Sequence, residues 1–179
     1  AFAKDIEAIV SELKSLQSAY PSISRATSLV NTCKPHLAVI KSNLGSTNDE
    51  YLTISSAVAN NALGMVISVV NSAQSSSNLA VNISNGTLAS TINSAITAMS
   101  VIGSLDMTST ERSHFNQNNS TLSSLKSQLS SLSSYGSSSY GGGATYRSPS
   151  SSSSDDTNWG CIIQIIIGVI IAIFAAINR

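Results

Sequence analysis

The chain has 179 residues, in which nine basic residues balance nine acidic ones, and only 10% of residues are charged against about 25% in ordinary soluble domains. Serine occupies 39 positions, so the surface meets water mainly through hydroxyl and amide groups. The neutral balance gives no indication of a nucleic-acid partner, and the low charge is not typical of a cytosolic enzyme. It suits an extracellular coat, an assembly whose subunits bury one another, or an acidic or glycosylated setting.

The first two stretches carry apolar residues at alternating steps of three and four, which predicts amphipathic helices. The first seam is followed by Pro21 and consists of Phe2, Ile6, Ile9, Leu13, Leu16 and Tyr20. The second is followed by Gly45, which suits a helix C-cap, and consists of Ile23, Ala26, Val30, Cys33, Leu37, Ile40 and Leu44. Pro35 falls inside the second seam, so we expect a kink or a division into two short helices there.

Three further helices are predicted up to Leu132. The third begins after the N-cap cluster Ser46-Thr47-Asn48, and its seam consists of Leu52, Ser56, Ala59, Leu63, Val66, Val70 and Ala73. The fourth begins near Asn78, is loosened at Gly86, and has a seam of Leu88, Ile92, Ala95, Met99 and Ile102. The fifth begins at Thr108–Glu111, where hydroxyl caps precede an acidic residue, and has a seam of Phe115, Leu122, Leu125, Leu129 and Leu132.

Each predicted helix has a single apolar stripe, so none is stable alone and the stripes must pack together. The predicted fold class is therefore all-α, an antiparallel up-and-down bundle of about five heptad-spaced helices over residues 1–132. A low-complexity stalk and a C-terminal transmembrane helix are expected to follow it.

The third and fourth predicted helices form a hairpin without charge, since no Asp, Glu, Lys or Arg occurs in the 55 residues from Tyr51 to Leu105. Three arrangements fit this pattern. The hairpin forms the bundle centre, shielded by the charged helices; it is buried between subunits of an oligomer; or it enters a membrane as a pore-forming pair. The third arrangement needs oligomerisation to hide the polar face, because neither apolar run reaches about 18 clean residues.

Residues 133–158 are dominated by Ser, Gly and Tyr, a composition that cannot bury a core. We expect a flexible linker or stalk there, with an end-to-end distance of roughly 25–30 Å. Pairing of its spaced tyrosines with another chain is the alternative.

Residues 159–179 predict a membrane segment, because Trp159 to Ile177 carries no charge and only one amide, Gln164. As a helix it spans roughly 28 Å, close to the ~30 Å hydrocarbon core, and Trp159 lies where an interfacial aromatic belongs. The apolar side chains of this segment are Ile162, Ile163, Ile165, Ile166, Ile167, Val169, Ile170, Ile171, Ile173, Phe174 and Ile177. A buried oligomerisation helix and an aggregation-prone strand are the alternatives, but only a helix or a closed barrel satisfies the backbone in lipid.

The charges around this segment predict its topology. Asp155 and Asp156 precede it and Arg179 follows it, so the positive-inside rule places the bundle outside the cell and the C-terminus in the cytoplasm. The small residues 150–153, followed by a polar spacer and an apolar end, also fit a GPI-anchor signal, in which case the tail would be removed. The opening Ala1-Phe2-Ala3 fits a chain that has lost a secretory signal peptide, and an arbitrary starting point would look the same.

Residue patterns typical of catalysis do not occur in the sequence. His36 and His114 are the only histidines, and neither lies in a cluster with metal-ligand spacing. No phosphate-binding glycine loop and no nucleophile-elbow motif is found. We therefore expect no enzyme, no cofactor and no metal ion.

The sequence also contains candidate sites for N-glycosylation and two cysteines. Asn82, Asn85 and Asn119 each begin an N-glycosylation acceptor pattern, which matters only if the protein passes through a eukaryotic secretory pathway. Two cysteines cannot make a disulfide framework, so Cys33 and Cys161 are expected to be free thiols, with an intermolecular link through Cys161 as the alternative.

Together these features predict a non-enzymatic, membrane-anchored surface protein of structural type. Its partners would be the lipid bilayer and either further copies of the chain, as a homo-oligomer, or a protein whose identity the sequence does not indicate. The alternative is a pore-forming or membrane-active protein that uses the uncharged hairpin 51–105, the C-terminal apolar helix, or both.

Overall fold

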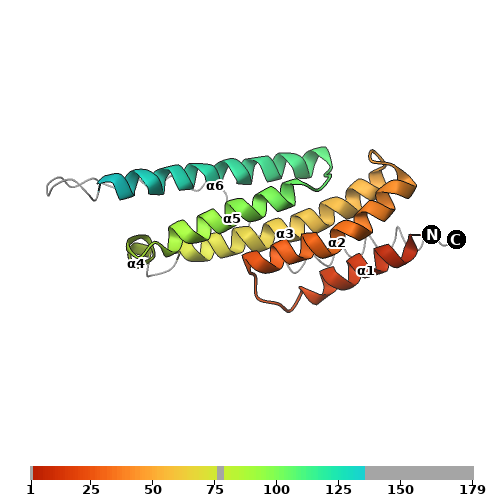
Figure 1. The fold of residues 1–179 in the computed structure, drawn as a ribbon, viewed down its shortest axis with the longest axis horizontal. Coiled ribbons are helices and arrows are strands. Elements are labelled where there is room, and N and C mark those ends of the chain that lie inside the picture. Colours follow the sequence, from red (N-terminus) through yellow and green to blue (C-terminus); the bar gives the residue numbers. More distant parts are fainter. Residues whose placement is uncertain (1, 76–78, 136–179) are drawn as a thin grey trace.

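The computed structural model describes residues 2–75 and 79–135, which form six α-helices and no strand (Figure 1). The helices are α1 (Ala3–Ser15), α2 (Ile23–Leu44), α3 (Asp49–Ser75), α4 (Leu79–Ser84), α5 (Thr87–Gly103) and α6 (Ser109–Tyr135). The all-α prediction is confirmed for these residues, although six helices replace the expected five. The predicted membrane segment, Cys161 and most of the predicted stalk lie outside the described residues.

Consecutive long helices run beside one another in alternating directions, so the described part of the chain is elongated (Figure 1). α2, α3 and α5 pack against each other in the centre, α1 covers α2, and α6 lies along α5. Because α6 contacts α5 and only a small part of α3, most of its circumference is open to solvent.

The first predicted seam is correct in its middle and wrong at its end. Ile6, Ile9 and Leu13 are buried on α1, but α1 ends at Ser15 and Tyr20 is 90% exposed. The final turn tightens, since the N–H of Leu16 donates to the Leu13 carbonyl at 3.3 Å. Tyr20 cannot extend the helix because the residue before a proline is disfavoured in the helical conformation.

Pro35 does not divide the second helix, so the predicted break at this position is wrong. α2 is continuous from Ile23 to Leu44, with Ser22 as its N-cap and Gly45, at φ 95°, as its C-cap. Pro35 and Asn31, whose carbonyl loses its helical N–H partner to the proline ring, both lie on the exposed side of α2. Water can therefore replace the missing hydrogen bond at little cost.

The central helix α3 is enclosed over most of its length. Asn48 caps it as predicted, because its Oδ1 accepts hydrogen bonds from the N–H groups of Glu50 at 2.9 Å and Tyr51 at 3.1 Å. Further buried residues lie outside the predicted seam: Tyr51, Ile54, Val58 and Ala62. α3 is therefore buried by its own chain on more than one side, as the bundle-centre arrangement requires.

The predicted fourth helix is two helices, because the chain breaks where it was expected only to loosen. Gly86 adopts φ 76°, a left-handed conformation that glycine reaches without steric cost, and α5 begins at the next residue. The preceding α4 has only six residues and leaves Val81 and Ile83 54% and 39% exposed.

α6 begins at a cap that the sequence predicts, in which the N–H of Glu111 donates to Thr108 Oγ1 at 3.4 Å. Phe115 and Leu122 are buried, whereas Leu125 and Leu129 are half-buried. A close approach fixes the start of this helix, since a Cβ at Gly103 would lie 2.9 Å from Phe115 Cζ. α6 continues to Tyr135, three residues beyond the predicted end of the bundle at 132.

Candidate interaction surface

Charged side chains are unevenly distributed over the described residues. They lie on α1, on α2, and at the end of the bundle where α3 and α6 begin (Figure 1). The exception is Lys126 in the distal half of α6. The described structure therefore has a charged part and a neutral part, and the neutral part comprises α4, α5 and most of α6.

A group of polar side chains, here called the charged corner, joins the α5–α6 connection to α2 and α3. Asp106 Oδ2 accepts hydrogen bonds from Tyr51 Oη at 2.6 Å and from Lys41 Nζ at 2.8 Å. The bonds from Lys41 and Tyr51 hold the pKa of the Asp106 carboxyl below its usual range. Burial and, to a smaller extent, the hydrogen bond to Asp106 raise the pKa of Tyr51 above its ordinary value. At neutral pH the corner thus pairs a charged carboxylate with a protonated phenol.

Arg112 completes the corner by holding the α5–α6 connection in place. Its guanidinium donates to the backbone carbonyls of Gly103 at 3.1 Å and Leu105 at 2.6 Å. On the other side, the N–H of Thr108 donates to Ser56 Oγ of α3 at 2.9 Å. These bonds set the direction in which α6 leaves the corner and runs along α5.

A neutral surface extends from the corner along α5 and α6. Its exposed α5 residues are Ala89, Ser90, Asn93, Ser94, Thr97 and Ser100. Its exposed α6 residues are Asn116, Gln117, Ser120, Thr121, Ser123 and Ser124.

Several hydroxyls on α5 and α6 already donate to carbonyls of their own helix. Examples are Thr97 to Asn93 at 3.1 Å, Thr121 to Gln117 at 3.0 Å and Ser123 to Asn119 at 3.0 Å. A donor that is satisfied within its helix loses little when a partner covers it. The neutral surface can therefore be buried with fewer unsatisfied polar groups than its sequence suggests.

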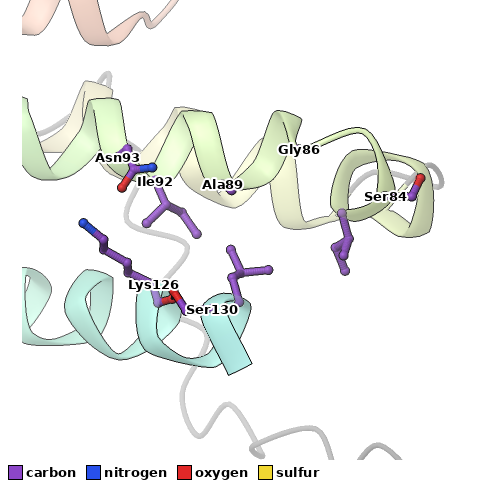
Figure 2. Close-up of a pocket in the computed structure, with 9 residues that line it drawn as sticks. Ser84, Gly86, Ala89, Ile92, Asn93, Lys126 and Ser130 are labelled. Carbon is purple, nitrogen blue, oxygen red and sulfur yellow. The ribbon is translucent and has the colours of Figure 1, made fainter. Parts of the chain in front are cut away.

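An apolar groove lies at the far end of the neutral surface, between α4, the start of α5 and the distal half of α6 (Figure 2). Its volume is ≈ 500 Å³, and its apolar lining comes from Ile83, Ala89, Ile92 and Leu129. Figure 2 shows Ile92 directed from α5 toward α6 and Lys126 extended from α6 toward α5. Lys126 is the one charged residue in the lining of this groove.

The predicted acceptor asparagines occupy different environments. Asn85 is exposed in the α4–α5 turn, where its Oδ1 accepts from the N–H of Thr87 at 2.9 Å. Asn82 is half-buried on α4 and donates to the Ala73 carbonyl at 3.2 Å, and Asn119 is half-buried on α6. Asn85 is the most accessible of the three, and glycosylation remains a prediction.

Cys33 is buried on α2 and is a free thiol. Burial, with a smaller effect from Glu12, raises the pKa of Cys33 to about 12, so little reactive thiolate forms at neutral pH. His36 Nδ1 lies 2.8 Å from Asp5 Oδ1, which links α1 to α2. The described residues contain no group of three His, Cys, Asp or Glu that could hold a metal ion.

One described helix is long and apolar enough to cross a membrane. The most apolar 18-residue window of the stretch Asp49–Gln74 in α3 has a mean hydropathy of 1.5, and 67% of that window is buried inside the chain. The central helix of a water-soluble bundle meets the same test, so this finding is weak evidence for membrane insertion.

Comparison of the chain with protein-family models, with curated proteins and with solved structures found no match. Sequence reasoning missed the groove and the corner. The available signal for the corner was that Tyr51 begins the charge-free stretch and Asp106 directly follows its end.

Proposed function

We propose that this chain is a non-enzymatic, membrane-anchored surface protein whose bundle assembles with copies of itself, or binds a protein partner, through the neutral surface of α5 and α6. The proposal rests on one observation. Two adjacent helices expose surfaces without a charged side chain, α5 from Ala89 to Ser100 and α6 from Asn116 to Ser124. Interface centres are depleted in charged residues, because an unpaired charge is costly to bury.

The open side of α6 supports this role. Helices within a bundle normally bury one stripe against several neighbours, whereas α6 packs mainly on α5 and leaves its remaining sides exposed. Its 27 residues extend about 40 Å at 1.5 Å per residue, which offers a second bundle a long contact line. Self-assembly through this surface would cover Ser, Thr and Asn side chains without burying a charge.

A single lysine substitution tests the assembly. Ser94→Lys puts an ammonium group on the neutral surface, and Ser11→Lys on the exposed side of α1 is the matched control. We expect native mass measurements of the full chain in mild detergent to show an oligomer for the unmodified and Ser11→Lys proteins. The Ser94→Lys protein should be a monomer. An oligomer that persists unchanged in Ser94→Lys would show that the neutral surface is not the contact.

The membrane anchor is proposed to be Ile162–Ile177, with the bundle on the extracellular side and the C-terminus in the cytoplasm. Its support is the charge-free apolar sequence between Asp156 and Arg179. A chain ending at Asp156 should appear in the supernatant after carbonate extraction, whereas the full chain should stay with the membrane. Release of the full protein by a GPI-cleaving phospholipase would favour the GPI-anchored alternative.

A membrane-active role is the second candidate, favoured by the apolar length of α3. For α3 to enter a bilayer it would have to leave the centre of the bundle, where Ile54, Val58 and Val66 are fully buried. Release of a vesicle-trapped dye by the unmodified protein would support this pore-forming alternative. Intact vesicles together with an oligomer that Ser94→Lys disrupts would support the structural role.

A further inference from the structure

The groove exposes large apolar side chains at the end of a neutral surface that consists mostly of Ser, Thr, Asn and Gln. Ile83 is 39% exposed, Leu129 is half-buried, and Ile92 lies at the base of the ≈ 500 Å³ space between them. Large exposed apolar groups at a concave site are typical of a surface that another apolar segment covers.

The chain itself supplies such a segment close to the groove. Ser130 lines the groove, and α6 ends five residues later at Tyr135. Residues 136–161 then connect α6 to Ile162, and the tether that the composition predicts has an end-to-end distance of roughly 25–30 Å. One turn of helix and this tether allow the start of the Ile162–Ile177 segment to return to the groove.

Charge complementarity points to the same segment. Lys126 is the one charged residue that lines the groove, and Figure 2 shows its side chain reaching toward α5. After Glu111 the only acidic residues in the sequence are Asp155 and Asp156, just ahead of the apolar segment. An apolar segment preceded by two carboxylates therefore matches an apolar groove bordered by one ammonium group.

We infer that, when no membrane is present, the beginning of the Ile162–Ile177 segment docks in the α4–α5–α6 groove, with Asp155 and Asp156 toward Lys126. The inference rests on the proposed membrane anchor and adds its regulation. The groove covers part of the apolar segment in water, and a bilayer competes for that segment. A second copy of the chain is the other candidate occupant, but neither the tether nor the acidic pair requires one.

The native Cys161 provides a direct test, because it precedes the apolar segment by one residue. Ala89→Cys places a second thiol at the exposed lip of the groove, and Ser11→Cys places one on α1 as a matched control. Full chains made without lipid are incubated with oxidised glutathione and compared on a non-reducing gel. A disulfide forms only where the two Cα atoms come within about 7 Å.

We expect a monomer with an internal disulfide in the Ala89→Cys protein, at least tenfold more than in Ser11→Cys, and none once Cys161→Ser is added. Added vesicles should reduce the cross-link. Equal cross-linking in the two proteins would overturn the inference. A disulfide-linked dimer of Ala89→Cys that is lost when Cys161→Ser is added would also overturn it, because the apolar segment of a second copy would then occupy the groove.

Two further variants test the contact between Lys126 and the acidic pair. Because the second variant should restore the cross-link that the first one weakens, misfolding alone cannot explain the result. Lys126→Glu in the Ala89→Cys background should reduce the cross-link several-fold, and replacing both Asp155 and Asp156 by Lys should restore it. A charge swap that leaves the cross-link unchanged would argue against the charged contact. Carbonate extraction of the same proteins measures anchoring separately, so a missing cross-link with intact anchoring removes only the docking inference.

Discussion

Removing the carboxylate of Asp106 should loosen the corner at which α6 begins. Asp106→Ala deprives Tyr51 Oη of its acceptor at 2.6 Å, and Tyr51 is only 3% exposed, so water replaces the lost bond poorly. A hydrogen bond to a charged group contributes about 1.5–3 kcal/mol. The Lys41 partner is worth less, about 0–1 kcal/mol, because both side chains of that ion pair are more than 40% exposed. We expect a total loss of about 2–3 kcal/mol in the free energy of unfolding.

A double-mutant cycle separates these two contributions. Urea denaturation followed by far-UV circular dichroism would compare Asp106→Ala, Tyr51→Phe and Lys41→Ala with their pairwise combinations. The coupling energy between Tyr51 and Asp106 should be about 1–2 kcal/mol, and that between Lys41 and Asp106 below about 1 kcal/mol. Additive losses for Tyr51→Phe and Asp106→Ala would refute the reasoning, because they would show that the short bond contributes no stability.

The same carboxylate predicts the direction of the pH dependence. Its pKa lies below the ordinary value when the chain is folded, so the unfolded state binds the proton more readily. The contribution of Asp106 is therefore present above its ordinary pKa, about 3.9, and is lost as the pH falls through the folded value. Asp106→Asn should flatten this acid limb of the stability curve while leaving the shape near neutral pH unchanged.

Three further predictions concern packing and reactivity. Leu122→Ala should lower the free energy of unfolding by about 2–5 kcal/mol, because Leu122 is only 5% exposed. Ser124→Ala on the exposed side of α6 should change it little, and the thermal midpoints of the two variants check this difference. Gly103→Ala should destabilise by about 1–3 kcal/mol, since its Cβ would lie 2.9 Å from Phe115 Cζ, and Phe115→Leu in the same chain should recover part of the loss. Cys33 should react with a thiol reagent only at the rate of unfolding, and fast labelling in native buffer would show that α2 is not packed as described.

Local patterns in the sequence identified most helix positions correctly. The three-and-four spacing located the buried residues Ile6, Ile9 and Leu13, and Asn48 and Gly45 marked caps that the structure confirms. These features depend on residues within one or two turns of each other, so they can be read from neighbouring positions in the sequence.

The charged corner and the groove could not be predicted in this way, because both depend on distant parts of the chain. Lys41 and Asp106 are 65 residues apart, and Tyr51 and Asp106 are 55 apart. The groove exists because α4 is short while α6 continues past the start of α5. Helical periodicity specifies which side of each helix is apolar, but it does not specify how far one helix extends beyond another.

The absence of charge between Tyr51 and Leu105 has different physical causes on α3 and on α5. On α3 the absence of charge follows from burial, since α1, α2, α5 and α6 pack around this helix and a charge there would lose its hydration. On α5 burial explains only the side that carries Leu88, Ile92 and Met99. Ser90, Ser94 and Thr97 face solvent, where a charged residue would cost nothing within the described fold. The packing of the described chain therefore does not account for the neutrality of the exposed side of α5, and this is the reason for proposing that another molecule contacts it.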